Sequence, residues 1–402
     1  MPILYDPKAP DVIADPYPVL RRLQTEDPVH RSEILGGWVL TRYVDVRAGL
    51  ADPRLSADRI SPFVSHPSGR AKPEVRELGR FVGMWAVFTD PPRHTRLRSL
   101  LNRAFTSREV ERLRPLIEEL VNTLLDRVAG AGRMDVIRDF AYPLPVAVIA
   151  EMIGVPREDG ERFKAWSDEL AAFIGSAAAT DKYARAARGM TEMRDYFRRM
   201  VVARRAEPRE DIMSRLIAAE ERGDALSEDE LVATCVMLLF AGHETTTNLI
   251  GNGLLALLQH PQELRALSDE PSLAASAVEE LLRYDGPNQA MVRIATEDFD
   301  LDGRRIRHGD RLFLMLNAAN RDPGQFSNPD RVDLCREPNR HLAFGHGIHF
   351  CLGAPLARLE AQIAFPALLR RLPSLALATD SLEWIDSLIF RGVTSLPVTF
   401  GA

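Results

Sequence analysis

The sequence predicts a mostly helical fold with a minor β region, organised as a single domain over residues 1–402. Through most of residues 93–222, apolar residues recur at helical spacing, as Leu113, Ile117 and Leu120 do. Strand and hairpin patterns gather mainly after residue 299. The length would allow two or three domains, but no Ser/Gly-rich linker, repeat or low-complexity tract divides the chain. One large domain is therefore expected.

The composition excludes several classes of protein. The formal net charge of −6 is mild and argues against a dedicated nucleic-acid binder. Three cysteines in 402 residues indicate a reducing compartment rather than a disulfide scaffold. Residues 1–7 lack the basic and apolar regions of a signal peptide, and the apolar stretch around 231–242 is too short to span a bilayer. We expect a cytoplasmic protein without a membrane anchor.

The individual elements follow from local patterns. Residues 15–23 suggest a short helix after Asp15-Pro16, and residues 38–43 have the composition of a strand. Around residues 299–306, Asp302-Gly303 predicts a hairpin turn, with another strand after Gly309. Residues 391–400 form a last strand-like run.

A long central helix is predicted from Ser227 to Gln259. Ser227 and Glu230 form a capping box, and the next residues are apolar on nearly every side, so the helix must be buried. A polar stretch, residues 241–247, then interrupts it, and Gly242 weakens the helix by about 1 kcal/mol relative to Ala. One interpretation is a kink with threonines bonded to the preceding turn. The other is an opening of the helix beside a ligand.

The most informative segment surrounds Cys351. It lies in a glycine-rich bend, and Pro355 favours a helix start directly after it. A thiolate there would lie near unpaired helix N–H groups and the positive end of the helix dipole. A lone cysteine is often only a small core residue, and a zinc site is a further alternative because His341, His346 and His349 are close in sequence. The histidine spacing fits no common zinc site, whereas a metal with a thiolate ligand under a large flat group fits the glycines.

These residues carry a resemblance to a known family. Phe344, Gly347, Cys351 and Gly353 resemble the heme-binding signature of cytochromes P450, and their flanks resemble the soluble bacterial branch. The resemblance implies the single-domain P450 fold, with heme between the long central helix and the helix after the cysteine. The implied cofactor is heme b (iron protoporphyrin IX), with Cys351 as the iron ligand and Phe344, Gly345 and Gly353 in the cofactor loop.

The same resemblance assigns the polar stretch of the central helix. Ala241 and Gly242 match the oxygen-binding groove beside the heme. Thr245 corresponds to the alcohol that hydrogen-bonds dioxygen and Glu244 to the acid of the proton relay, which makes them the catalytic candidates. Thr246 is expected to be structural.

Further positions are implied around the cofactor. Glu280 and Arg283, with Arg336 as a third member, match the buried pair that supports the heme-binding loop; without that context, a Glu-x-x-Arg spacing is usually a surface pair. The candidate propionate ligands are His94, Arg98, Arg293 and His349. The implied substrate pocket, where ordinary core packing is the alternative for each residue, contains Met84, Trp85, Ile174, Leu238, Asn288, Met291, Val292, Ile389 and Phe390. Asn288 is polar where the family is usually apolar, so it is a candidate contact for a polar substrate group.

The resemblance implies a monooxygenase that inserts one oxygen atom from O2 into a hydrophobic small molecule, by hydroxylation or epoxidation, in secondary metabolism or catabolism. No flavin or nicotinamide domain is fused, so electrons are expected from a ferredoxin or flavodoxin with its reductase. The basic residues between Arg93 and Arg103, and Arg336, Arg340 and Arg358, are the expected docking face. The alternatives are a peroxide-driven peroxygenase, against which the Glu244–Thr245 pair argues, and a non-catalytic heme-binding protein.

Overall fold

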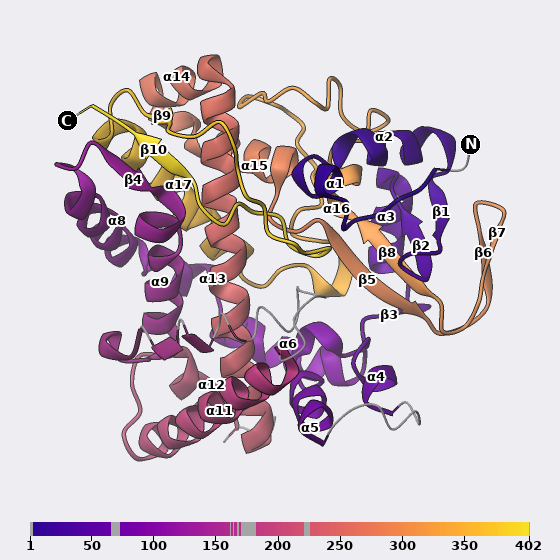
Figure 1. The fold of residues 1–402 in the computed structure, drawn as a ribbon. Helices are drawn as coiled ribbons and strands as arrows, with labels where there is room; N and C mark the ends of the chain where they lie inside the picture. Colours follow the sequence, from indigo (N-terminus) through magenta and orange to yellow (C-terminus); the bar gives the residue numbers. More distant parts are fainter. Residues whose placement is uncertain are drawn as a thin grey trace. The chain divides into compact units, whose positions relative to one another are not determined.

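The computed structural model describes residues 3–65, 73–160, 182–220 and 226–401, and positions 162, 163, 165, 166 and 169. The chain divides into two compact units. Unit 1 comprises residues 1–55, 114–145 and 244–402, and unit 2 comprises residues 56–113 and 146–243. Helices dominate and strands are a minor component (Figure 1), which confirms the predicted fold class.

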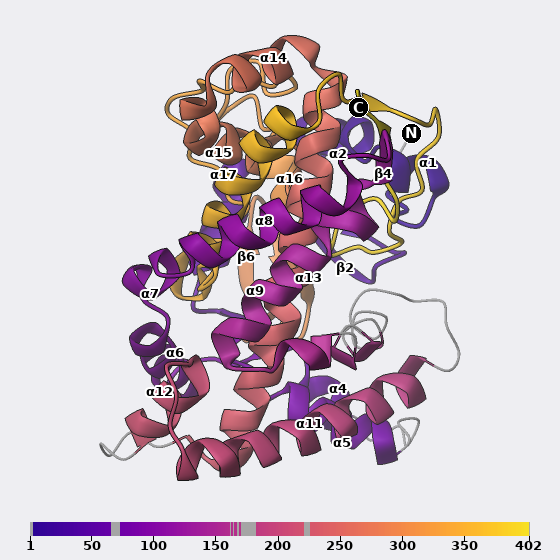
Figure 2. The same cartoon turned by 90° about the vertical axis from the view of Figure 1, so that its left-hand side faces the viewer.

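Helices form a large part of unit 1. Its helices are α1 (Pro10–Ala14), α2 (Tyr17–Glu26), α3 (Tyr43–Ala51), α8 (Arg114–Val128), α14 (Pro261–Asp269), α15 (Ala274–Asp285), α16 (Leu316–Ala319) and α17 (Ala354–Arg371). Helix α17 packs against both α8 and α15 (Figure 2). This packing buries the apolar side of α17 directly after the cysteine loop.

The larger sheet of unit 1 has the strand order β1-β2-β8-β5-β3. The strands are β1 (Val29–Ser32), β2 (Gly37–Leu40), β3 (Leu55–Ser56), β5 (Ala290–Ala295) and β8 (Arg311–Met315). Alternate residues enter different core clusters: Leu312 and Leu314 join one, and Phe313 and Met315 the other. Both faces of the sheet are therefore buried.

Two smaller sheets complete unit 1. Strands β6 (Phe299–Leu301) and β7 (Arg304–Ile306) form a hairpin whose turn residues Asp302 and Gly303 have φ angles of 50° and 71°. This is the backbone that an Asp-Gly turn favours, and it confirms the predicted hairpin. In the other sheet, β10 (Pro397–Thr399) pairs with β4 (Arg133–Asp135) and β9 (Ala376–Leu377).

Unit 2 is built from helices. They are α4 (Ser61–Ser65), α5 (Pro73–Val82), α6 (Arg93–Ala104), α7 (Ser107–Glu111), α11 (Lys182–Ala206) and α12 (Ile212–Glu220), with α9 (Pro143–Ile153) beginning at the boundary between the units. Helix α11 packs against α5, and α12 against α6. An aromatic cluster around Phe163, Trp166 and Tyr196 contributes to the core of the unit.

Helix α13 (Glu228–Gln259) is the predicted long helix. Its capping box is present: the backbone N–H of Glu230 donates to Ser227 Oγ at 3.2 Å, and the N–H of Ser227 donates to the Glu230 carboxylate at 3.1 Å. The helix ends at Gln259, as expected, and continues through the polar stretch without a break in its helical backbone.

The structure refines two expectations of secondary structure. The described residues between 93 and 222 are mostly helical, as predicted, but Arg133–Asp135 forms β4, and a π-helical turn covers Ile137–Ala141. The strand-like run at residues 391–400 forms a regular strand only at Pro397–Thr399, because the residues before it make a single bridge, Trp384 with Val393. Among the described residues, no helix is both long and apolar enough to cross a membrane.

Candidate functional site

The cysteine loop is a tight bend closed by its own backbone. The N–H of Cys351 donates to the carbonyl of Phe344 at 2.9 Å, and the N–H of Gly345 donates to the carbonyl of Leu342 at 2.8 Å. Gly345 and Gly347 have φ angles of 73° and 74°, in the left-handed region that favours glycine. The loop therefore needs glycine at both positions to place Cys351 opposite Phe344.

Gly347 has a second role that its sequence context did not reveal. A Cβ atom at this position would lie 3.2 Å from the carbonyl oxygen of Leu50 and 3.3 Å from Cα of Ala51, at the end of α3. This glycine therefore allows the loop to pack closely against the backbone of unit 1, rather than only leaving space for a ligand.

The cysteines differ in burial. Cys351 is partly exposed, whereas Cys235 is buried and its pKa is raised to about 12 by burial. Helix α17 begins at Ala354, three residues after the cysteine, with Pro355 in its first turn as predicted. Gly353 adjoins the sulfur, since a Cβ there would lie 3.9 Å from Cys351 Sγ. A partly exposed cysteine on a glycine-rich bend, beside the start of a helix, is compatible with a thiolate ligand for heme iron.

Residues that precede this loop in the chain form a buried ion-pair cluster. Arg283 Nε and Nη2 donate to the two carboxylate oxygens of Glu280 at 2.7 and 2.8 Å, and both side chains are fully buried. Arg336 Nε adds a contact to each oxygen at 3.1 Å. The guanidinium of Arg283 also donates to the backbone carbonyls of Asn320, Pro329 and Arg331. The cluster therefore fixes the irregular segment around residues 320–336, which precedes the cysteine loop.

A second ion cluster joins α15 to α17 and was not predicted. Glu279 accepts hydrogen bonds from Arg358 at 2.6 and 2.8 Å and contacts His341 Nε2 at 3.0 Å. Burial raises the pKa of the Glu279 carboxyl, but the Arg358 and His341 contacts outweigh it and lower the pKa to about 2. Arg358 also lies over the ring of Phe344, 4.5 Å from its centroid. The cluster thus contacts the cysteine loop itself.

The polar stretch of α13 interrupts a buried helix surface. Residues 231–240 and 246–257 are buried, whereas Ala241 is exposed and Glu244 and Thr245 are partly exposed. Gly242 is packed tightly against Ile149, because a Cβ atom at residue 242 would lie 2.8 Å from Cγ1 of Ile149. His243 is buried, and burial lowers its pKa to about 4. The accessible positions are therefore those that the resemblance assigns to the groove and the proton relay.

Unit 2 holds two propionate candidates on α6. His94 is buried and Arg98 partly exposed, one turn apart on the helix, with Arg98 Nε donating to Asn102 at 3.1 Å. The backbone N–H of His94 donates to the carbonyl of Asp90, whose carboxylate accepts bonds from Ser56 and the N–H of Ala57. The start of α6 is therefore tied to the preceding chain.

The pocket candidates of unit 2 differ in burial. Trp85 is buried between Phe88 and Phe240, with ring centroids 6.0 and 5.8 Å away, so its indole packs in the core of the unit. Leu238 is also buried, and Met84 is partly exposed. Ile174 lies outside the described residues.

Unit 1 holds the remaining candidates. Arg293 is buried on β5, and His349 is partly exposed in the short turn Gly347–His349 before the cysteine. Asn288 and Phe390 form an isolated antiparallel bridge, which brings two predicted pocket segments side by side. Met291 is partly exposed, and Val292 and Ile389 belong to or pack against the same core cluster.

The structure changes the expected docking face. Arg336 is buried against Glu280, and Arg358 pairs with Glu279, so neither presents a free charge at the surface. In unit 2, Arg96 Nη2 lies 2.6 Å from Glu230 Oε1, so this carboxylate neutralises part of the positive charge of the Arg93–Arg103 segment. Arg340 is exposed. The sequence suggested an exposed basic surface because arginines are frequent in these segments. It did not reveal their acidic partners, which are distant in the chain.

The described residues give no support to the zinc alternative. Among them, no group of three or more His, Cys, Asp or Glu side chains is placed to hold a metal ion. His341 is instead engaged by Glu279. Within the described part of the chain, the arrangement thus lacks the four-ligand set of a structural zinc site.

Comparison with known proteins agrees with this geometry. The family model described as cytochrome P450 matches residues 64–387. The polyketide biosynthesis cytochrome P450 PksS of Bacillus subtilis is 42% identical, over 99% of this chain and 98% of its own length. The full length of the chain is therefore represented in a relative.

Solved structures show the same fold. The crystal structure of P450BioI in complex with an acyl carrier protein ligated to hexadec-9Z-enoic acid superposes with a TM-score of 0.90 at 41% identity, over 97% of this chain and 99% of that one. The myxobacterial cytochrome P450 CYP267B1 in complex with myristic acid gives a TM-score of 0.89 at 43% identity, over 98% and 99% of the two chains.

Proposed function

Since this chain belongs to the cytochrome P450 family and is a monooxygenase with heme b as its cofactor, we propose that it hydroxylates or epoxidises an elongated, mainly apolar molecule of the fatty-acyl or polyketide class. The observation that carries the proposal is the partly exposed Cys351 on its glycine-rich bend before the start of α17. Heme with a thiolate ligand supplies O2 activation. The protein residues hold the ligand, position the substrate and deliver protons.

Cys351 is the proposed iron ligand, and the two ion clusters keep its loop in place. Glu280, Arg283 and Arg336 fix the segment before the loop, and Arg358 on α17 contacts Phe344 within it. His94, Arg98, Arg293 and His349 are the proposed propionate ligands. A rigid loop matters because the sulfur must hold its position while the iron changes its state.

Glu244 and Thr245 are the proposed proton-delivery residues. They are accessible in the middle of a helix whose flanking residues are buried, so water and dioxygen can reach them while the rest of α13 is packed. A hydroxyl and a carboxyl in this position can pass a proton from solvent to an oxygen atom nearby. We expect Thr245→Ala to bind substrate normally but to form less product for each O2 consumed.

The substrate class follows from the relatives together with the apolar wall segments. PksS takes part in polyketide biosynthesis by its name, and the two structural neighbours hold a fatty acid or a fatty-acyl carrier protein. Met291, Ile389 and Phe390 are partly exposed apolar residues of unit 1, as a wall against an acyl chain would need. Asn288 beside them is the proposed contact for a polar group on the chain.

Electrons are proposed to come from a separate ferredoxin or flavodoxin with its reductase. Because Arg336 and Arg358 are engaged inside unit 1, the proposed docking residues are now Arg340 and the exposed arginines of the Arg93–Arg103 segment. Charge reversal of Arg103, and in a separate variant of Arg340, should slow reduction at low salt, and each difference from the wild type should shrink as salt is added. Equal rates at every ionic strength would exclude the substituted residue from the docking site.

The test of the function compares the wild type with Cys351→Ser after reconstitution with heme. The reduced wild type bound to carbon monoxide should show the red-shifted band of a thiolate ligand, and the variant should lose it. With a ferredoxin, its reductase and O2, the wild type should convert myristic acid to hydroxylated products. Turnover with hydrogen peroxide but none with reductant and O2 would instead identify a peroxygenase. An unaltered spectrum in Cys351→Ser would refute the assignment of the ligand.

A further inference from the structure

We propose that Gln289 is a positioning residue: its side-chain amide holds residues 387–390 against residues 288–292 and so sets the shape of the substrate-facing wall. This inference rests on the proposed function, because that function assigns these two segments to the wall. Gln289 itself is not proposed to touch substrate. It acts from behind the wall, through two backbone carbonyls.

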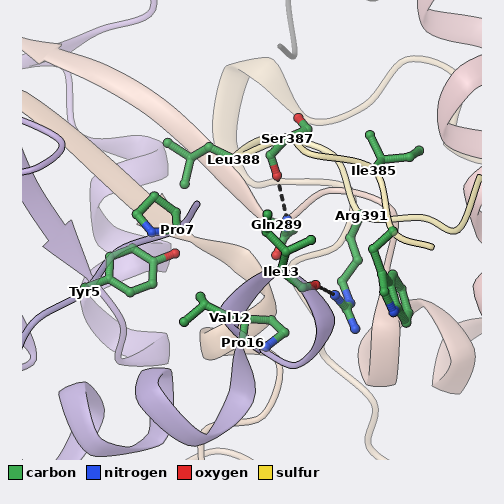
Figure 3. A pocket seen from close by; sticks show the side chains of 11 residues that line it. Tyr5, Pro7, Val12, Ile13, Pro16, Gln289, Ile385, Ser387, Leu388 and Arg391 are labelled. Atoms are coloured by element: carbon green, nitrogen blue, oxygen red, sulfur yellow. Dashed lines mark hydrogen bonds between the residues drawn. The ribbon is translucent and has the colours of Figure 1, made fainter. Parts of the chain in front are cut away.

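The amide of Gln289 makes three hydrogen bonds. Nε2 donates to the carbonyl of Ser387 at 2.9 Å (Figure 3). Nε2 also donates to the carbonyl of Phe390 at 3.1 Å, and Oε1 accepts from Asn317 Nδ2 at 3.3 Å. The backbone N–H of Gln289 also donates to the carbonyl of Ile389 at 2.8 Å. One residue therefore contacts three of the four residues of the facing turn.

The turn formed by residues 387–390 has few other anchors of its own. Ser387 Oγ accepts from the N–H groups of Ile389 and Phe390 at 3.2 and 3.0 Å, which closes the turn on itself. Its backbone connection to the neighbouring segment is the Asn288–Phe390 bridge, with bonds from the N–H of Gln289 to the carbonyl of Ile389 and from the N–H of Arg391 to the carbonyl of Pro287. The Gln289 amide adds the side-chain link between the closed turn and this segment.

Gln289 lies on the side of the wall that faces the N-terminal segment. It lines a small cavity of about 10 Å³ with Tyr5, Val12 and Ile13, which has room for about one water molecule (Figure 3). The side chain of Gln289 points toward this cavity and the N-terminal segment (Figure 3). A substitution at residue 289 is therefore expected to act on the wall through the carbonyls of Ser387 and Phe390.

The far end of the turn is fixed independently. Arg391 Nε donates to Asp285 Oδ1 at 2.7 Å, and its two Nη atoms donate to the carbonyls of Ile13 and Ala14 at 3.0 and 3.1 Å. Phe390 is thus held by Arg391 on one side and by Gln289 on the other. Removal of the Gln289 amide should release one side only, which changes the position of Ile389 and Phe390 without unfolding the segment.

Glutamate at residue 289 should turn the attraction to the two backbone carbonyls into repulsion. A carboxylate has the same shape as the amide but no donor, so it would place negative charge against the carbonyls of Ser387 and Phe390. Asparagine keeps the donor but is one methylene too short to reach both carbonyls. Gln289→Glu is therefore the strong variant, and Gln289→Asn is the mild one in case the first does not fold.

The chain offers a matched control in Gln24 of α2. Its Nε2 also donates to two backbone carbonyls, those of Thr41 at 2.9 Å and Ala318 at 2.7 Å, and its side chain is partly exposed like that of Gln289. Gln24→Glu should therefore cause a similar loss of thermal stability. It lies on α2, which is not part of the proposed wall.

The experiment measures binding to the heme-loaded protein by the shift of its Soret band. 4-Phenylimidazole reports the shape of the wall, since its ring must fit beside the iron, and imidazole serves as the small reference. We expect Gln289→Glu to raise the Kd for 4-phenylimidazole by about tenfold and to leave imidazole unchanged, with a smaller effect of the same sign for Gln289→Asn. Gln24→Glu should change the ratio of the two constants by less than about twofold.

These outcomes separate the inference from the proposed function. If the ratio is unchanged in both Gln289 variants, or if Gln24→Glu shifts it equally, the positioning role is refuted. If the wild type gives no shift or product with myristic acid, the substrate class is wrong, but the azole ratio still tests Gln289. Where myristic acid is a substrate, Gln289→Glu should also redistribute the positions of hydroxylation, and Gln24→Glu should not.

Discussion

Arg283 binds Glu280 through the Nε and Nη2 edge of its guanidinium, at 2.7 and 2.8 Å, and neither side chain has any exposed surface. The charge of this pair is further compensated inside the protein, by Arg336 and by backbone carbonyls. Loss of Arg283 would leave the buried Glu280 carboxylate with Arg336 as its remaining cationic partner and without its two shortest hydrogen bonds.

We expect Arg283→Ala to lower the free energy of unfolding by about 3–5 kcal/mol, because Glu280 would remain as a buried charge. Urea denaturation followed by circular dichroism measures this loss. The control is Arg305→Ala, which removes an exposed pair with Asp298 and Asp300 and should cost less than about 1 kcal/mol. Similar losses in both variants would contradict the structural role of the buried pair.

Glu279 gives a pH-dependent prediction. Its pKa in the folded protein is about 2, below the ordinary value of 4.5, so its ion pairs with Arg358 and His341 stabilise the fold above pH 4.5. This stabilisation is lost as the pH falls toward 2. We expect Glu279→Gln to lower stability by about 1–2 kcal/mol at pH 7, with the difference from wild type vanishing in acid. A difference that is constant from pH 7 to pH 3 would argue against the ion pairs.

Glu360 on α17 should show the opposite dependence. Burial raises its pKa well above the ordinary value of 4.5, and within the described residues neither carboxylate oxygen has a hydrogen-bond partner. The folded protein therefore retains a proton that the unfolded chain releases above pH 4.5, so stability falls as the pH rises. Glu360→Gln should remove this dependence of stability on pH. Its free energy of unfolding should therefore rise relative to the wild type by up to about 1.4 kcal/mol for each pH unit. Denaturation curves at pH 5, 6, 7 and 8 measure the gain, and parallel curves would refute a protonated Glu360.

Gly242 tests the packing of α13. Alanine would improve helix propensity by about 1 kcal/mol, but its Cβ would lie 2.8 Å from Cγ1 of Ile149, which is closer than packed atoms allow. We expect Gly242→Ala to destabilise the protein by about 1–3 kcal/mol, and Ile149→Ala in the same chain to relieve part of that cost. Gly130→Ala is the control, because nothing lies within 4 Å of a Cβ there. Additive losses in the double variant would contradict the close contact.

The parts of the fold that the sequence predicts are those with local causes. Ser227 and Glu230 cap α13 within one helical turn, and Asp302-Gly303 fixes its hairpin through two adjacent φ angles. Strand β4 was missed because its pairing partner, β10, lies far away in the chain, and nothing within Arg133–Asp135 favours a strand over a helix. A short edge strand of this kind depends on its partner rather than on its own residues.

The same distinction holds at the candidate site. Cys351 and the Glu280–Arg283 spacing are visible because their chemistry lies within a few neighbouring residues. The burial of Arg336 and the pairing of Arg358 with Glu279 are not visible, because the acidic partners lie 56 and 79 residues away. The sequence therefore showed positive charge near the cysteine but not its acidic partners, which are buried for Arg336 and partly exposed for Arg358.

The bonds from Arg391 to the carbonyls of Ile13 and Ala14 have a practical consequence for engineering. If residues 387–390 line the substrate site as proposed, these bonds connect α1 to that site through Arg391. Truncation of the amino terminus would then be expected to change the distribution of products, a variable that libraries restricted to substrate-lining positions do not sample.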